Sequence, residues 1–414
     1  MKIKGKYTIH INGYDWGCCS DSVFICFDEV IDSINKADIQ ITETRENTDF
    51  SSLAFPIVVS DFNREIEDIY LTDETGKPID GPSRFMKIDL KVSPNDGSVL
   101  CFNMHTQYNT WADPYTLSFR LNQPLYSNNQ KVDEIEITDS GKRKSIIDEY
   151  PIHEYKASDG TLYQYLNYVP EKSSDTLVVW LHGLGEGGNV TVEKTDVRIT
   201  ALANKVTALF GKDFQDTMKG AHVLVPQCPT YWMDKDGKQT NFHHGMIKAD
   251  GTSYYMESLV ECIDWYAKSV NAKKIILTGC SNGGYMTQVL GMNYPGKWAG
   301  LVPICEAVPD KYITGRQIQN LAKTPIFYIY SKDDPIVDPK IHEIPTIERI
   351  RKENPINLKV STTEYVIDES GLYANPDGTK PYLYSGHWSW IYFDNNSSKD
   401  DTTGISVWDW MASL

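Results

Sequence analysis

Residues 274–290 read KIILTGCSNGGYMTQVL, and this stretch decides the fold of the second half of the chain. The apolar run up to Thr278 predicts a buried strand, and the run after Gly284 predicts a helix. Between them, Gly-x-Ser-x-Gly at 279–283 is typical of a nucleophile elbow, a sharp turn that lifts a strained serine above the sheet edge. Both glycines are expected because a Cβ there would collide with the neighbouring strand or helix. The alternative is a glycine-rich turn with an idle serine.

The elbow lies in a series of short apolar runs that alternate with helical patterns from about residue 145 onward. Such alternation predicts a mostly parallel sheet covered by helices on both faces, with the chemistry at the carboxyl ends of the strands. The expected strands are 177–181, 223–225, 275–278, 301–304, 326–330 and 360–367, and the expected helices are 192–210 and 254–270.

The first part of the chain has the period-two pattern of β-strands. Arg84 to Val92 alternates apolar and charged residues, and Asn95-Asp96-Gly97 predicts a hairpin turn into the next strand at 99–102. Similar segments are 23–27, 39–42, 56–59, 66–71 and 115–121. Their number and spacing indicate an immunoglobulin-like β-sandwich, although a carbohydrate-binding sandwich would have the same pattern.

The 414 residues favour two domains, and a polar stretch at 126–144 is expected to hold the boundary. We therefore expect a β-sandwich at 1–138 and an α/β domain at 145–414. Residues 135–137 could form one more strand of either domain.

Composition excludes several functional classes. The net charge is −16, whereas nucleic-acid binding requires clustered cations, so no nucleic-acid partner and no binding to anionic membranes are expected. No apolar run approaches the roughly 18 residues of a membrane span. The basic N-terminus precedes no apolar stretch, so the chain as written is expected in the cytoplasm, or outside the cell if a signal has been removed.

The eight cysteines form no Cys-x-x-Cys pair and are expected as free, mostly buried thiols. No Cys/His cluster has the spacing of zinc ligands, so neither a metal nor a cofactor is expected.

A reactive serine needs a base to take its proton and an acid to orient that base. In this type of sheet the chain order is Ser, acid, His, and only His342 and His387 follow Ser281. His387 lies in a loop after the last apolar strand and is the expected base, whereas His342 is expected on the surface of a helix. Asp334 is the expected acid because Asp-Pro-Ile-Val follows the 326–330 strand. The alternatives are Asp333, Asp338 and Glu306.

The oxyanion of an acyl-transfer intermediate requires hydrogen-bond donors. The backbone N–H of Asn282 follows the serine, and the loop His182-Gly183-Leu184-Gly185 follows the 177–181 strand, so Leu184 N–H is the expected second donor. His182 itself is expected to be structural. Aromatic residues crowd the surrounding loops, and Trp232 and Trp388 are the expected walls of a substrate pocket, with ordinary packing as the alternative.

Together these motifs resemble the bacterial α/β-hydrolase esterases with an N-terminal immunoglobulin-like domain, the EstA type. The resemblance rests on residues 181–188, 225–229, 279–284, 334–337 and 386–390, and more loosely on 12–17. It implies an α/β hydrolase preceded by an immunoglobulin-like sandwich, and hydrolysis of short-chain carboxylic esters. The Gly-x-Ser-x-Gly-Gly form also resembles feruloyl esterases and polyhydroxybutyrate depolymerases, which leaves aromatic or plant-polymer-derived esters open.

The sequence therefore predicts a serine carboxylesterase that uses Ser281, His387 and Asp334 on small or oligomeric esters, and it leaves homo-oligomer formation open. One alternative is a peptidase of the prolyl-oligopeptidase type, although about 130 residues are too few for a seven-bladed propeller. The other is a glycan-binding protein with an inert hydrolase half.

Overall fold

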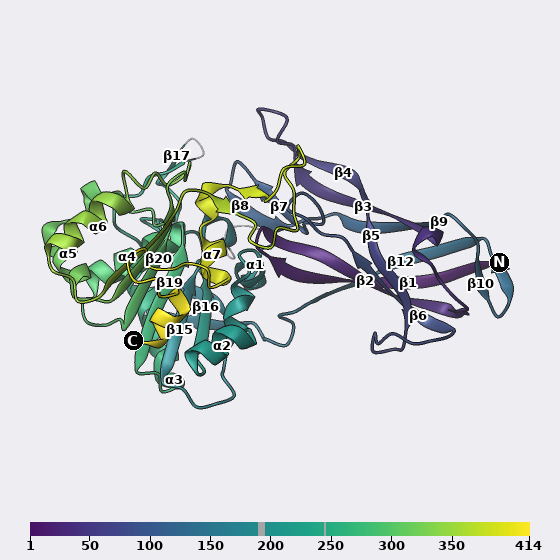
Figure 1. The fold of residues 1–414 in the computed structure, drawn as a ribbon, viewed down its shortest axis with the longest axis horizontal. Coiled ribbons are helices and arrows are strands. Elements are labelled where there is room, and N and C mark those ends of the chain that lie inside the picture. The colour runs from purple at the N-terminus through teal and green to yellow at the C-terminus, as the bar shows by residue number, and fades with distance from the viewer. Residues whose placement is uncertain (189–194, 244–245) are drawn as a thin grey trace. The chain divides into compact units, whose positions relative to one another are not determined.

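The computed structural model describes residues 1–188, 195–243 and 246–414. The chain forms two compact units, one of Met1–Met104 and Asn109–Glu149, the other of His105–Tyr108 and Tyr150–Leu414 (Figure 1). The first unit extends past residue 138, because it includes the whole of strand β12 (Glu134–Ser145). In the described part of the chain, no helix has both the length and the apolar character needed to cross a membrane.

The first unit is all-β, as predicted. A five-stranded sheet has the order β12-β1-β2-β6-β5, a three-stranded sheet has the order β4-β3-β9, and β7–β8 and β10–β11 are two-stranded. Neighbouring strands of the five- and three-stranded sheets, and β10 with β11, are antiparallel, except β1 with β12, which is parallel. The immunoglobulin-like class stays a prediction. Besides β12, the strands are β1 (Lys2–Tyr14), β2 (Gly17–Ile31), β3 (Ile39–Thr48), β4 (Ile57–Arg64), β5 (Ile66–Thr72), β6 (Ser83–Leu90), β7 (Leu100–Asn103), β8 (Tyr108–Trp111), β9 (Tyr115–Leu121), β10 (Leu125–Ser127) and β11 (Gln130–Val132), with a short 3-10 helix η1 (Lys36–Asp38).

The prediction that Asn95-Asp96-Gly97 joins two paired strands of a hairpin is wrong. The tight turn is present, since Ser93 and Asp96 exchange backbone hydrogen bonds. However, β6 pairs with β2 and β5, whereas β7 pairs with β8, so the two strands beside the turn belong to different sheets. The turn therefore carries the chain from one sheet to another.

The second unit contains an eight-stranded sheet of order β13-β14-β16-β15-β19-β20-β21-β22. From β16 to β22 neighbouring strands are parallel, and β13 and β14 add an antiparallel edge. The strands are β13 (His153–Lys156), β14 (Leu162–Tyr168), β15 (Thr176–Leu181), β16 (His222–Gln227), β19 (Lys274–Cys280), β20 (Gly300–Ile304), β21 (Ile326–Ser331) and β22 (Leu358–Thr363), with small pairs β17 (Phe242–His243) with β18 (Met246–Ile247) and β23 (Val366–Ile367) with β24 (Leu383–Tyr384).

Helices cover both faces of this sheet, as predicted (Figure 1). The α-helices are α1 (Val197–Leu202), α2 (Lys212–Met218), α3 (Met256–Ser269), α4 (Asn282–Asn293), α5 (Gly315–Ala322), α6 (Glu343–Lys352), α7 (Trp390–Asp394) and α8 (Val407–Ala412), and the 3-10 helices are η2 (Leu184–Glu186), η3 (Val206–Phe210), η4 (Asp310–Tyr312) and η5 (Gly386–Trp388). Alternate residues of β15 face different layers: Leu177 and Val179 belong to the core cluster with α3–α6, whereas Trp180 packs on Phe393 of α7. Burial on both faces explains why these strands are continuously apolar.

The single helix expected over 192–210 is wrong for its described part. Residues 192–194 lie outside the described residues, and the remainder is divided into α1 and η3. Lys205, just before η3, has a φ of +53°, which ends the regular helix. The strand expected over 360–367 is also divided, into β22 and β23.

Candidate active site

Ser281 occupies the turn between β19 and α4, with a φ of +54° and a ψ of −113°. A positive φ is uncommon for a residue with a side chain and costs free energy that the surroundings must supply. The surroundings require glycine on both sides of the serine. A Cβ on Gly279 would lie 2.5 Å from the Leu181 carbonyl oxygen, and one on Gly283 would lie 1.8 Å from the same atom. The close approach of β15 to the turn therefore explains the two flanking glycines.

His387 links the serine to an acid. Its Nε2 lies 2.9 Å from Ser281 Oγ, and its Nδ1 lies 2.8 Å from Asp334 Oδ2. An ionised carboxylate accepts only, so Nδ1 carries the proton and Nε2 of the neutral ring can accept from the serine hydroxyl. The second oxygen of Asp334 accepts from the backbone N–H groups of Ile336 and Val337, at 2.8 and 2.9 Å. Both side chains are nearly buried, with residue exposures of 9% for His387 and 6% for Asp334.

The structure brings together the three residues that the sequence predicted as a triad. The alternative residues Asp333, Asp338 and His342 make other contacts. Asp333 is exposed and accepts from the Ser331 hydroxyl, and exposed Asp338 accepts from the Lys340 amide. His342 lies at the N-cap of α6, with its ring against the Asp338 carbonyl.

Glu306 is fully buried and accepts a 2.7 Å hydrogen bond from the Val308 amide. Glu343, at the start of α6, is also buried, and burial raises the pKa of both carboxyl groups, that of Glu306 to about 8. The sequence indicates Glu306 only as an alternative to Asp334 as the acid that orients the histidine. Glu343 was missed, because a glutamate at a helix N-terminus normally faces solvent.

The two residues whose backbone N–H groups are predicted to donate to the oxyanion both begin helices. Asn282 is the first residue of α4, so its N–H lies at a helix N-terminus, and Leu184 is the first residue of η2. Within the described residues neither N–H has a hydrogen-bond partner. The Asn282 side chain accepts from the Trp232 amide at 2.6 Å, which ties the elbow to the loop after β16.

His182, which directly follows β15, is fully buried. Its Nδ1 lies 2.6 Å from the Gly183 carbonyl oxygen, and its Nε2 lies 2.9 Å from the Cys228 backbone nitrogen. Burial lowers the pKa of His182 to about 4, which keeps the ring neutral at neutral pH.

The structure separates the two tryptophans predicted to wall a pocket. Trp232 is fully buried, packs 5.1 Å from the His182 ring and donates its Nε1–H to the His182 carbonyl, so it belongs to the core and not to a pocket wall. Trp388 is half-buried and lies in a row of aromatic rings that begins at His387. Trp390 meets His387 edge-on at 5.6 Å, Trp388 lies 6.1 Å from Trp390, and Tyr384 lies 5.9 Å from Trp388.

All eight cysteines are free thiols, and seven are buried. Cys305 follows β20 with a φ of +37°, and its sulfur lies with ligand atoms of Asp334 and His387 in a group no more than 4.8 Å across. Among the described residues this is the only group with the residue types and spacing of metal ligands, and His387 and Asp334 within it are hydrogen-bonded to each other.

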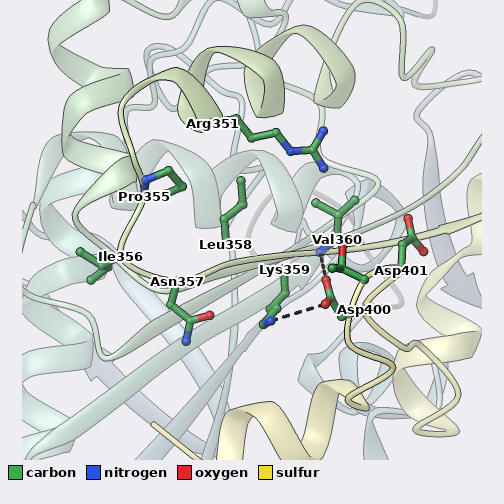
Figure 2. Close-up of a pocket in the computed structure, with 10 residues that line it drawn as sticks. Arg351, Pro355, Ile356, Asn357, Leu358, Lys359, Val360, Asp400 and Asp401 are labelled. Carbon is green, nitrogen blue, oxygen red and sulfur yellow. Dashed lines mark hydrogen bonds and ion pairs between the residues drawn. The ribbon is translucent and has the colours of Figure 1, made fainter.

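A surface hollow of about 360 Å³ lies away from these residues, between the segments 351–360 and 400–402 (Figure 2). Asp400 accepts from the Val360 amide at 3.0 Å and from Lys359 at 3.4 Å, and Asp401 accepts from the Thr362 amide at 3.1 Å. These carboxylates satisfy amides of β22, the edge strand of the sheet, and thereby block pairing with another chain.

The mostly parallel sheet with an elbow serine and a histidine–acid pair beside it defines an α/β hydrolase. Residues 168–364 match the model of the phospholipase/carboxylesterase family. The matched segment is therefore similar to hydrolase domains of the phospholipase/carboxylesterase family, and the protein is a hydrolase. The matched segment contains Ser281 and Asp334, and His387 lies beyond it.

One solved structure agrees with this chain on the fold. A crystal structure of a thermostable esterase is similar over 94% of this chain and 96% of that chain, with a TM-score of 0.67 and 17% identity. Its coverage includes the N-terminal all-β region. A ferulic acid esterase matches 52% of this chain and 90% of its own at a TM-score of 0.36 and 13% identity. A carboxyl esterase from Bacillus coagulans matches 51% and 89% at a TM-score of 0.36 and 9% identity. No curated protein matches the sequence.

Proposed function

We propose that the protein is a serine carboxylesterase that hydrolyses short-chain carboxylic esters through an acyl-enzyme. One observation carries this proposal: His387 lies within hydrogen-bond distance of both the strained Ser281 and the doubly anchored Asp334. A serine hydroxyl becomes a useful nucleophile when a base oriented by a third group can take its proton.

In the first half of the reaction, Ser281 Oγ attacks the ester carbonyl carbon while its proton passes to His387 Nε2. Asp334 stabilises the imidazolium through Nδ1–H, and the Leu184 and Asn282 N–H groups donate to the oxyanion. The tetrahedral intermediate then collapses, the C–O bond to the alcohol breaks, and His387 returns the proton to the leaving oxygen.

In the second half, water attacks the acyl-enzyme with His387 again as base. The bond from the acyl carbon to Ser281 Oγ breaks, His387 protonates that oxygen, and the carboxylic acid leaves. Apart from the ester and one water molecule, both halves use only groups of this chain.

The row of aromatic rings that begins at His387 supports esters with an aryl acyl or alcohol group as a second substrate class. The Trp390 ring lies edge-on to His387 and the Trp388 ring lies against Trp390, and stacked or edge-on ring contacts are worth about 0.5–1.5 kcal/mol beyond area burial. An aryl ester would gain this contact, whereas acetate or butyrate esters of small alcohols would not.

The test combines covalent labelling with a substrate series. A fluorophosphonate should give one adduct on Ser281, absent in Ser281→Ala and retained in Ser173→Ala, which changes an exposed serine of the same unit. 4-Nitrophenyl acetate, butyrate and octanoate, methyl ferulate and a proline-containing peptide amide should then rank the substrates. Faster turnover of the amide than of every ester would favour the peptidase alternative. No adduct and no turnover by folded protein would favour the inert, glycan-binding alternative.

A further inference from the structure

The buried histidine that precedes the oxyanion loop has a fixed tautomer. The Cys228 backbone N–H donates to His182 Nε2, so that nitrogen is the acceptor. The remaining ring proton is therefore on Nδ1, which donates to the Gly183 carbonyl oxygen at 2.6 Å. A charged ring, with protons on both nitrogens, would oppose the Cys228 N–H.

This hydrogen bond sets the direction of the next peptide group. The Gly183–Leu184 peptide is trans, and in a trans peptide the C=O and N–H bonds point in opposite directions. Because His182 holds the Gly183 oxygen toward the protein interior, the Leu184 N–H must point away from the ring. Leu184 N–H has no partner among the described residues, as an oxyanion donor requires.

A second contact ties the same histidine to the other predicted donor. Trp232 Nε1–H donates to the His182 carbonyl at 3.1 Å, and the Trp232 backbone N–H donates to Asn282 Oδ1 at 2.6 Å. The residue before the Leu184 loop and the residue after the nucleophile are therefore linked through one buried tryptophan.

We propose that His182 is a positioning residue of the esterase, whose neutral Nδ1–H tautomer fixes the Gly183–Leu184 peptide with its N–H directed at the oxyanion. The proposal rests on the proposed function. His182 touches no substrate and acts only through the peptide that it holds.

Two substitutions separate the two hydrogen bonds. His182→Asn retains a donor near the position of Nδ1 and loses the acceptor for Cys228, whereas His182→Gln retains an acceptor near the position of Nε2 and loses the donor to Gly183. Removal of one oxyanion donor costs roughly 10²- to 10³-fold in kcat. We expect His182→Gln to lose about 100-fold in kcat with little change in KM, and His182→Asn to lose about tenfold or less.

Rates are normalised to sites titrated by fluorophosphonate, so loss of folded protein alone does not count. A merely structural role predicts equal kcat per titrated site in both variants and in wild type, and that result would overturn the proposal while wild-type hydrolysis persists. Absence of both hydrolysis and labelling in wild type would overturn the proposed function as well.

If neither variant folds, nitrogen-15 NMR of wild-type protein labelled at histidine decides the matter. We expect one ring with a protonated Nδ1 and an unprotonated Nε2 at pH 7 that becomes charged only near pH 4. A ring protonated on Nε2 at this position would overturn the proposal.

Discussion

Acidification should destabilise the hydrolase unit through His182. Burial lowers the pKa of this histidine to about 4 in the folded protein, whereas the ordinary value is 6.5. Between these values the unfolded chain binds a proton that the folded chain does not, so the free energy of unfolding falls as the pH falls from about 6.5 to 4. The two pKa values differ by about 2.5, so the free energy of unfolding should be about 3 kcal/mol lower at pH 4 than above pH 7.

Other groups titrate in the same window, so the assay compares wild type with His182→Asn. Urea unfolding at pH 7.0, 5.5 and 4.5 is followed by tryptophan fluorescence and by residual hydrolysis of an acetate ester, which reports the hydrolase unit specifically. Although the variant is expected to be less stable at pH 7, its stability should depend less on pH. The difference between the two proteins should therefore shrink by about 2 to 3 kcal/mol on acidification to pH 4.5.

A difference that stays constant from pH 7.0 to 4.5 would refute the reasoning. It would mean that the His182 ring becomes charged in the folded state at its ordinary pH, and that the buried, neutral ring described above is incorrect. A matched control is His10→Asn in the first unit, whose half-exposed ring contacts Asp21 and should leave the hydrolase transition unchanged at every pH.

Three further predictions concern the triad, the elbow and a buried carboxyl group. Asp334→Asn should lower kcat by about 10⁴-fold, because the tautomer of His387 is no longer fixed. In the same ester assay, the control Asp338→Asn should change kcat by no more than about threefold. Gly283→Ala should yield no folded hydrolase unit, because the new Cβ would lie 1.8 Å from a carbonyl oxygen, whereas Gly315→Ala, with no atom within 4 Å, should express as folded protein by circular dichroism. Burial raises the pKa of Glu306 to about 8 from an ordinary 4.5, so stability is lost as the pH rises between these values; Glu306→Gln should unfold at higher urea than wild type at pH 9, and an equal shift at pH 5 would count against this explanation.

The sequence predicted those parts of the fold that depend on local patterns. The strand, turn and helix at 274–290 were recognisable because the two glycines and the apolar run are all within a few residues of Ser281. The all-β character of the first unit followed from period-two alternation. Strand pairing was harder: Asn95-Asp96-Gly97 forms its turn locally, but the partners of β6 and β7 are chosen by packing with strands far away in the sequence.

The triad could be proposed because its chain order restricts the choices to two histidines and a few carboxylates. The supporting contacts had no such restriction. His182 bonds Cys228, which is 46 residues away, and nothing in the sequence marks that amide as its partner. Trp232 was predicted as a pocket wall because aromatic residues are common both in pockets and in cores, and only its burial distinguishes the two.

The two halves of the proposed site are held by different segments, and this has a mechanistic consequence. Asp334 lies on the loop after β21 and His387 in η5 after β24, whereas Leu184 and Asn282 follow β15 and β19. Their supports do not overlap, since backbone amides beside Asp334 fix the acid, and His182 with Trp232 braces the oxyanion side. Substitutions that disturb the support of Asp334 should change proton transfer and its dependence on pH. Substitutions of His182 or Trp232 should lower the stabilisation of the oxyanion by a similar factor at every pH above the range in which His182 becomes charged.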